Sequence, residues 1–216
     1  MQATDISKTA SAATIVFEAL RQAIIQGEMK DGDPLRQDEI ARLFNTSRIP
    51  VREAITMLEQ QGLVKTQRYK GAVVAGLSPD EASEIFDFRA LLEGTVIQAA
   101  VPRMTPDTRQ AARDCLQAFS RSSDPMEWGT LNREFHYALY RDSAMPYHLQ
   151  VISNALDRID RYLRAQLVLS DGMARANAEH LAILEACEAG RAEQAAELTR
   201  RHILGAKAVL LDHLAR

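Results

Sequence analysis

The sequence contains no apolar run long enough to cross a membrane. A membrane-spanning helix needs about 18 or more consecutive apolar residues, and every hydrophobic stretch here is interrupted well before that length. The first ten residues are polar and lack the apolar segment of a secretory signal peptide. We therefore expect a cytoplasmic protein that makes no use of a membrane.

Cysteine is scarce, and common enzyme motifs are missing. The two cysteines, Cys115 and Cys187, lie far apart and form no Cys-x-x-Cys pair. This pattern excludes a disulfide scaffold and favours buried, unreactive thiols in a reducing compartment. The sequence also lacks a His-Glu-x-x-His motif and a general base placed beside its histidines. Both absences argue against the alternative of a metal-dependent hydrolase.

The chain has no overall excess of positive charge, which taken alone argues against a nucleic-acid partner. Its net charge is −3 at pH 7. The distribution is uneven, however, because residues 36–70 hold seven basic and four acidic side chains. Contacts with DNA phosphates need only a local cluster of basic residues. This stretch is therefore compatible with DNA binding.

The composition changes near residue 76, which predicts two domains, 1–76 and 77–216. The first part combines short helical patterns with one β-rich stretch. The second is dominated by Ala, Leu, Glu, Arg and Gln, which are good helix formers, and has almost no strand character. We expect a mainly α fold, with an N-terminal winged helix-turn-helix followed by an all-α helical bundle.

The periodicity of apolar residues predicts the individual elements. In the first part we expect helices at about 11–26, 37–44 and 48–61, then strands at 63–66 and 72–74 that form a hairpin. In the second part we expect about six helices, at 78–101, 106–121, 125–141, 146–169, 173–189 and 191–214. Ser78 and Pro79 begin the second part with a helix-capping pattern, and Thr46 or Ser47 can cap the helix that starts at Arg48.

The third predicted helix exposes polar donors at its N-terminal end. Thr46, Ser47, Arg48 and Arg52 gather there, and the two arginines share a helix face because they are four residues apart. Arginine can bind guanine through two hydrogen bonds or clamp a phosphate, and hydroxyls at a helix N-terminus can bind phosphate. In a second group, Lys70 and Gly71 form the predicted tip of the wing. The alternative is a helical hairpin whose basic face is merely solvated.

Three of the five histidines lie on apolar faces of three different predicted helices. These are His136, His180 and His202, and Asn132 stands one turn before His136. Inward-facing polar side chains need partners, because burying them unsatisfied is costly. They can converge on a metal ion, for which neutral imidazoles are good ligands. Alternatively, each is a separate core histidine with its own hydrogen bond.

The first part resembles the DNA-binding domain of the GntR family of transcriptional regulators. The resemblance rests on residues 34–41, 45–54, 61–64 and 70–72, and its most specific part is the run Ser-Arg-Ile-Pro-Val-Arg-Glu-Ala that starts at Ser47. It implies that Arg48 and Arg52 contact DNA and that Gly71 enters the minor groove. Some relatives carry a basic DNA-contacting residue where this chain has Asp38, so that contact is not carried over; Arg36 is the candidate to replace it.

The second part resembles the all-helical effector domain (FCD type) of the FadR-like GntR subgroup. Supporting stretches are 84–93, 132–136, 179–183 and 197–202. Metal-binding members use an Asp or Asn and three histidines at these positions, which here correspond to Asn132, His136, His180 and His202. The resemblance leaves the ion open among zinc, nickel, manganese and none, and Asn132 supplies one negative charge less than an Asp would.

The same resemblance implies an organic-acid effector. Arg89, on the first helix of this part, could pair with its carboxylate; the alternative for Arg89 is a surface salt bridge to Glu93. The expected function is a homodimeric regulator, by resemblance a repressor, that binds a double-stranded DNA operator and responds to a small carboxylate metabolite. A regulator that responds to the metal alone, without an organic effector, is an alternative.

Overall fold

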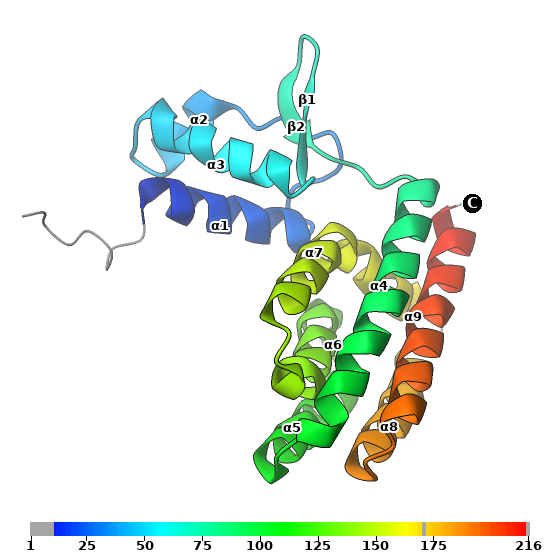
Figure 1. The fold of residues 1–216 in the computed structure, drawn as a ribbon. Coiled ribbons are helices and arrows are strands. Elements are labelled where there is room, and N and C mark those ends of the chain that lie inside the picture. Colours follow the sequence, from blue (N-terminus) through cyan, green and yellow to red (C-terminus); the bar gives the residue numbers. More distant parts are fainter. Residues whose placement is uncertain (1–10, 170–171, 215–216) are drawn as a thin grey trace, which may run out of the picture. The chain divides into compact units, whose positions relative to one another are not determined.

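A computed structural model describes residues 11–169 and 172–214 of the chain. The chain divides into two compact units, Met1–Gly76 and Leu77–Arg216, which are described separately below (Figure 1). Among the residues that the structure describes, no helix is both long and apolar enough to cross a membrane.

The first unit is a trihelical domain with a β-hairpin. Its elements are α1 (Ala12–Ile25), α2 (Gln37–Leu43), α3 (Arg48–Gln60), β1 (Val64–Gln67) and β2 (Gly71–Val74). Ser11 caps α1 by accepting a hydrogen bond from the backbone N–H of Thr14. Each helix buries one face in a common core. Val16 of α1 and Val51 and Leu58 of α3 are almost fully inaccessible to solvent. The elements expected from the sequence are therefore present within one or two residues.

The hairpin extends away from the three helices of its unit (Figure 1). Val64 pairs with Val74 and Gln67 with Gly71 in an antiparallel register. Both strands start or end one residue away from the predicted limits, since Gln67 and Gly71 belong to the ladder. Tyr69 and Gly71 have positive φ angles of 66° and 71°, which favour glycine. The tip is therefore a tight turn, and the glycine at position 71 adopts its left-handed conformation without strain.

The turn between α2 and α3 differs in one detail from the sequence expectation. Asn45 adopts a left-handed conformation with φ of 47°, which Asn tolerates better than most residues. Ser47 occupies the N-cap position of α3, but its side chain makes no capping hydrogen bond. Ser47 therefore occupies the predicted N-cap position, but the capping hydrogen bond expected from its side chain is not formed.

The second unit is a bundle of helices, as the sequence predicted. The described elements are α4 (Pro79–Ala100), η1 (Val101–Arg103), α5 (Pro106–Arg121), α6 (Pro125–Tyr140), η2 (Arg141–Ser143), α7 (Pro146–Leu169), α8 (Gly172–Glu188) and α9 (Ala192–Leu214). The short 3₁₀ helices η1 and η2 were not predicted. Ser78 and Thr105 cap α4 and α5, each accepting a backbone N–H three residues later, as the Ser/Thr-Pro start signals indicated.

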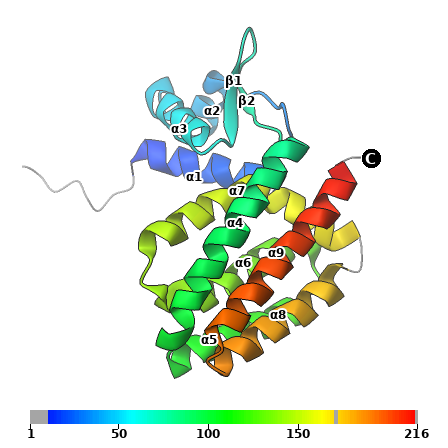
Figure 2. The same ribbon diagram turned by 45° about the vertical axis from the view of Figure 1, so that its right-hand side comes forward.

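Helices α4 and α9 run side by side in both ribbon views (Figures 1 and 2). Gly94 of α4 permits this approach, because a Cβ atom there would lie 2.7 Å from Nε and 3.0 Å from Cγ of Arg200 on α9. The core between the helices is apolar and closely packed. Its fully buried members include Phe86, Ile97, Leu139, Ile159, Ile183 and Leu210. This core holds α4, α6, α8 and α9 in fixed positions around the polar cluster described next.

Candidate DNA-binding surface and histidine cluster

The N-terminal end of α3 carries the predicted DNA-binding side chains. Arg48 and Arg52 are exposed there, Ser47 is exposed and Thr46 is half-buried. A surface recess of about 500 Å³ lies beside them, lined by Asp38, Ala41, Arg42, Asn45, Thr46, Ser47 and Arg48. The guanidinium of Arg48 forms an ion pair with Asp38 of α2. The first unit thus presents basic and hydroxyl donors at the start of its third helix.

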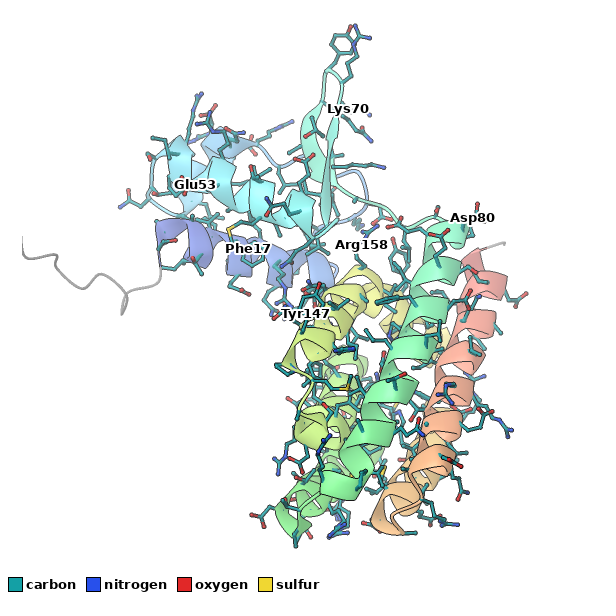
Figure 3. The ribbon with its side chains drawn as sticks, in the orientation of Figure 1. Phe17, Glu53, Lys70, Asp80, Tyr147 and Arg158 are labelled. Carbon is teal, nitrogen blue, oxygen red and sulfur yellow. The ribbon has the colours of Figure 1, made fainter. Side chains whose placement is uncertain are left out.

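The remaining predicted DNA-contacting residues lie elsewhere on this unit. Arg36 precedes α2 and pairs with Glu39 at 2.9 Å. Lys70 and Gly71 are exposed at the hairpin, where Figure 3 labels Lys70. The guanidinium of Arg68 stacks over the Tyr69 ring, with its carbon 4.8 Å from the ring centroid. The tip of the wing therefore offers charged and aromatic groups to a partner.

The three predicted histidines meet in the interior of the second unit. His136 of α6, His180 of α8 and His202 of α9 each place one ring nitrogen within 4.8 Å of the others. Nε2 of His180 lies 3.3 Å from Nε2 of His202. His136 and His180 are buried, and the side chain of His202 is only 10% exposed. Side chains from three different helices therefore converge on one point.

Partners on the opposite ring nitrogens orient two of these histidines. Nδ1 of His202 lies 2.6 Å from a carboxylate oxygen of Glu179, and Nδ1 of His136 lies 3.2 Å from the hydroxyl of Tyr140. Metal-bound histidines commonly use their second nitrogen in this way. The ring edges that carry Nε2 are thereby directed toward the shared centre.

The buried histidines are held in their neutral form. Burial, together with the neighbouring His202 and Arg89, lowers the pKa of His136 well below its usual value. Burial, with His202 and His136, likewise lowers the pKa of His180. Neutral imidazole is the form that coordinates a metal ion. His136 and His180 are thus in the protonation state that ligation requires.

The donor set fits a divalent transition-metal ion. Nε2 of His136 is buried and has no hydrogen-bond partner, which is costly for a polar atom unless something else satisfies it. At a metal–nitrogen distance of about 2.0–2.1 Å, two ligand nitrogens in tetrahedral or octahedral positions stand about 2.9–3.4 Å apart. The 3.3 Å between His180 and His202 lies in that range.

A small cavity of about 30 Å³ adjoins the cluster and has room for about one or two water molecules. It is lined by Arg89, Asn132, Leu163, Arg175, Ala176, Glu179, His202, Ile203 and Ala206. Asn132 and Arg89, both predicted site residues, thus face the same space as His202. The guanidinium of Arg175 lies 3.7 Å from Glu179, so two arginines and one carboxylate border the cavity.

The alternative predicted for Arg89 was a surface salt bridge to Glu93. The partner is correct, but the pair does not lie on the surface. Nε of Arg89 donates to Oε1 of Glu93 at 2.6 Å, but both side chains are buried, at 3% and 0% exposure. The pair is therefore an interior ion pair and not a surface one. Because Arg89 also borders the cavity, this pairing leaves open its use as a ligand contact.

The sequence indicated no role for three residues around the cluster, Tyr140 on α6 and Arg175 and Glu179 on α8, and it offered Glu93 on α4 only as a salt-bridge partner of Arg89. The hydroxyl of Tyr140 donates to Oε2 of Glu93 at 2.9 Å. Two spacings could have signalled them, because Tyr140 follows His136 by four residues and Glu179 follows Arg175 by four, which places each pair on one helix face.

A winged helix-turn-helix joined to an all-helical unit defines a class of DNA-binding transcriptional regulator. Residues 12–74 match the family described as bacterial regulatory proteins, gntR family. Residues 84–205 match the FCD domain, which covers more than half of the chain. The chain therefore belongs to the GntR family, in the group whose C-terminal part is an FCD domain, as the sequence motifs indicated.

Characterised and uncharacterised regulators share this organisation along most of the chain. The HTH-type transcriptional repressor GlaR of Escherichia coli K12 is 28% identical over 199 residues, covering 87% of this chain and 90% of that protein. The uncharacterised HTH-type regulator BphR of Paraburkholderia xenovorans LB400 is 27% identical, covering 92% and 84%. These relatives are transcriptional regulators and not enzymes, and this chain is likewise a transcriptional regulator.

Solved structures agree with the fold. The Escherichia coli protein McbR/YncC superposes with a TM-score of 0.82 at 21% identity, covering 95% of this chain and 99% of that one. A GntR-family regulator from Pseudomonas syringae pv. tomato DC3000 is 31% identical, with a TM-score of 0.57 and coverages of 94% and 86%. The first likeness supports the fold alone, and the second also supports family membership.

Proposed function

We propose that this protein is a homodimeric, cytoplasmic repressor whose affinity for operator DNA is controlled by a small organic acid. Residues 1–76 would bind DNA, and residues 77–216 would bind the effector and form the dimer. The observation that carries this proposal is the buried three-histidine cluster beside a cavity bordered by Arg89 and Arg175. Relatives named as repressors, including a gluconate operon repressor of Bacillus subtilis that is 38% identical over 96 residues, support the sign of regulation.

The DNA contacts would come from two parts of the first unit. Arg48 and Arg52 would read bases or clamp phosphates in the major groove, with Thr46 and Ser47 binding phosphate at the helix N-terminus. In the second part of the contact surface, Lys70 and Gly71 would approach the minor groove, and Arg36 would bind the backbone beside α2. The exposure of both arginines and of Ser47, whose side chain makes no capping hydrogen bond, supports these roles.

The metal would be held by Asn132, His136, His180 and His202. Zinc, nickel and manganese all accept such a set of imidazole and amide ligands. When bound, the ion would supply a positive charge that anchors a carboxylate oxygen. The buried, unpartnered Nε2 of His136 supports this assignment.

The effector would be an anion, because two arginines border the cavity beside the metal ligands. Arg89 would donate to its carboxylate from α4, and Arg175 from α8. Effector binding would shift the population of conformations that the bundle adopts and so change how two DNA-binding heads fit adjacent half-sites. Two linked heads are expected because their combined affinity greatly exceeds that of one.

Elemental analysis of the protein purified without chelators tests this proposal. We expect near-stoichiometric divalent metal in the wild type, and loss of it in a His136→Ala, His180→Ala double variant. His148→Ala is the matched control, because His148 is half-buried on α7 and contacts only Tyr147 among the described rings. Absence of metal from the wild type would refute the metal assignment and leave Arg89 and Arg175 as the effector contacts.

A DNA-binding titration separates the two modes of response. Operator affinity measured by fluorescence anisotropy should fall when candidate carboxylates are added at constant free metal. If affinity follows the free metal concentration and no carboxylate changes it, the protein is instead a metal-responsive regulator.

A further inference from the structure

A continuous chain of buried hydrogen bonds links α4 to the histidine cluster. Nε of Arg89 donates to Oε1 of Glu93 at 2.6 Å, and Oε2 of Glu93 accepts the hydroxyl of Tyr140 at 2.9 Å. The Tyr140 oxygen then lies 3.2 Å from Nδ1 of His136. All four side chains are 3% exposed or less. Water therefore does not compete for any of these contacts.

Arg89 and the ionised Glu93 fix which group donates in each of these hydrogen bonds. Arginine can only donate, so Glu93 accepts from Arg89 with one oxygen and from Tyr140 with the other. The single hydroxyl hydrogen of Tyr140 is thus committed to Glu93. The Tyr140 oxygen can then serve His136 only as an acceptor, which requires the proton of the neutral His136 ring to sit on Nδ1.

We propose that Tyr140 and Glu93 are positioning residues that hold His136 in its Nδ1-protonated tautomer, so that the lone pair of Nε2 faces His180 and His202. This inference rests on the proposed metal site and explains why Nε2 of His136 is buried without a partner. Oε1 of Glu93 pairs with the buried Arg89, and Oε2 is the oxygen that binds the hydroxyl hydrogen of Tyr140 and so orients it.

A comparison of two tyrosine variants tests the role of the hydroxyl. Tyr140→Phe removes the acceptor for Nδ1 of His136 and should weaken zinc binding about 10- to 100-fold, the usual effect of losing such a partner. Tyr137→Phe is the matched control on the same helix, because the Tyr137 hydroxyl donates to the carbonyl of Leu149 and not to a histidine. Zinc affinity is measured by competition with a chromophoric chelator.

The isosteric variant Glu93→Gln makes a sharper prediction. The single amide oxygen must accept from Arg89, so the amide nitrogen would donate to Tyr140. The Tyr140 hydroxyl would then donate to Nδ1 of His136, which moves the ring proton to Nε2 and blocks it as a ligand. We expect weakened zinc binding although no atom is added or removed near the histidines.

The tautomer is read directly from long-range ¹H–¹⁵N spectra of metal-free protein labelled at histidine. We expect the Nδ1-protonated pattern for His136 in the wild type and in Tyr137→Phe, and the Nε2-protonated pattern in Glu93→Gln. An Nε2-protonated ring in the wild type would overturn the proposal, as would unchanged tautomer and zinc affinity in both Glu93→Gln and Tyr140→Phe. If the wild type binds no zinc at all, the proposed metal site fails, while the metal-free spectra still decide the positioning role.

Discussion

Asp38 of α2 and Arg48, the first residue of α3, form an ion pair on the surface that carries the predicted DNA contacts. Both side chains are more than half exposed, so the pair contributes little to folding, about 0–1 kcal/mol. Its consequence is electrostatic. A carboxylate at this place offsets part of the positive charge of α3 and repels phosphate, and if Arg48 contacts DNA as proposed, it must leave or share Asp38.

Replacing Asp38 should therefore raise the affinity of the protein for DNA of any sequence. For Asp38→Asn we expect non-specific DNA to bind about 2- to 10-fold more tightly at low salt, with a smaller gain at high salt because ions screen the interaction. Fluorescence anisotropy with random and operator duplexes measures this. Asp107→Asn, at an exposed position on α5, is the control for total charge, and an equal gain in that variant would contradict a local effect.

Removing either arginine of α3 should weaken operator binding without unfolding the protein. We expect Arg48→Ala and Arg52→Ala each to cost about 1–3 kcal/mol, or about 5- to 150-fold in Kd, since both lie exposed at the end of α3 that we propose to bind DNA. Arg121→Ala, an exposed arginine in the last turn of α5, should leave Kd unchanged. Affinities are compared at one fixed salt concentration, and unaltered Kd in both α3 variants would mean that DNA is bound elsewhere.

The metal-free protein should lose stability as the pH falls below about 6.5. The pKa values of His136 and His180 lie well below 6.5 in the folded chain, so below that pH the unfolded chain binds more protons than the folded one. The free energy of unfolding then decreases by up to about 1.4 kcal/mol per histidine per pH unit. Urea denaturation in the presence of a chelator at pH 7.5 and 5.5 measures it. A His136→Gln, His180→Gln variant should show a shallower dependence, and identical slopes would show that other groups cause the loss.

Two helical glycines should respond to alanine in opposite ways. Gly94→Ala would place Cβ 2.7 Å from Nε of Arg200, so we expect overpacking between α4 and α9 to lower stability by about 1–3 kcal/mol. Gly205→Ala on α9 meets no atom closer than 4.0 Å, and its better helix propensity should add about 0.5–1 kcal/mol. Thermal denaturation distinguishes them, and a stabilised Gly94→Ala would mean that Arg200 moves aside freely.

The sequence was sufficient to predict which α-helices and strands form and which histidines face inward, but not the short 3₁₀ helices η1 and η2. Apolar periodicity and capping residues such as Ser78 and Thr105 are local signals, so they placed the helices of the second unit within one or two residues. The hydrogen-bond chain behind His136 was not predicted, because Glu93 and Tyr140 lie on helices whose pairing depends on the packing of the whole bundle. The burial of Arg89 was missed for the same reason, since a spacing of four residues gives the partner and not the depth.

The cavity beside the histidines is small. About 30 Å³ accommodates one or two water molecules, whereas even a two-carbon acid has four heavy atoms. A carboxylate that bound at Arg89, as proposed, would displace side chains of α4, α8 or α9, and the closely packed core would transmit such a displacement because it has little free volume to absorb it. If the effector binds here as proposed, occupation of the site and deformation of the bundle would be one event, so a small cavity would couple ligand binding directly to movement of the surrounding helices.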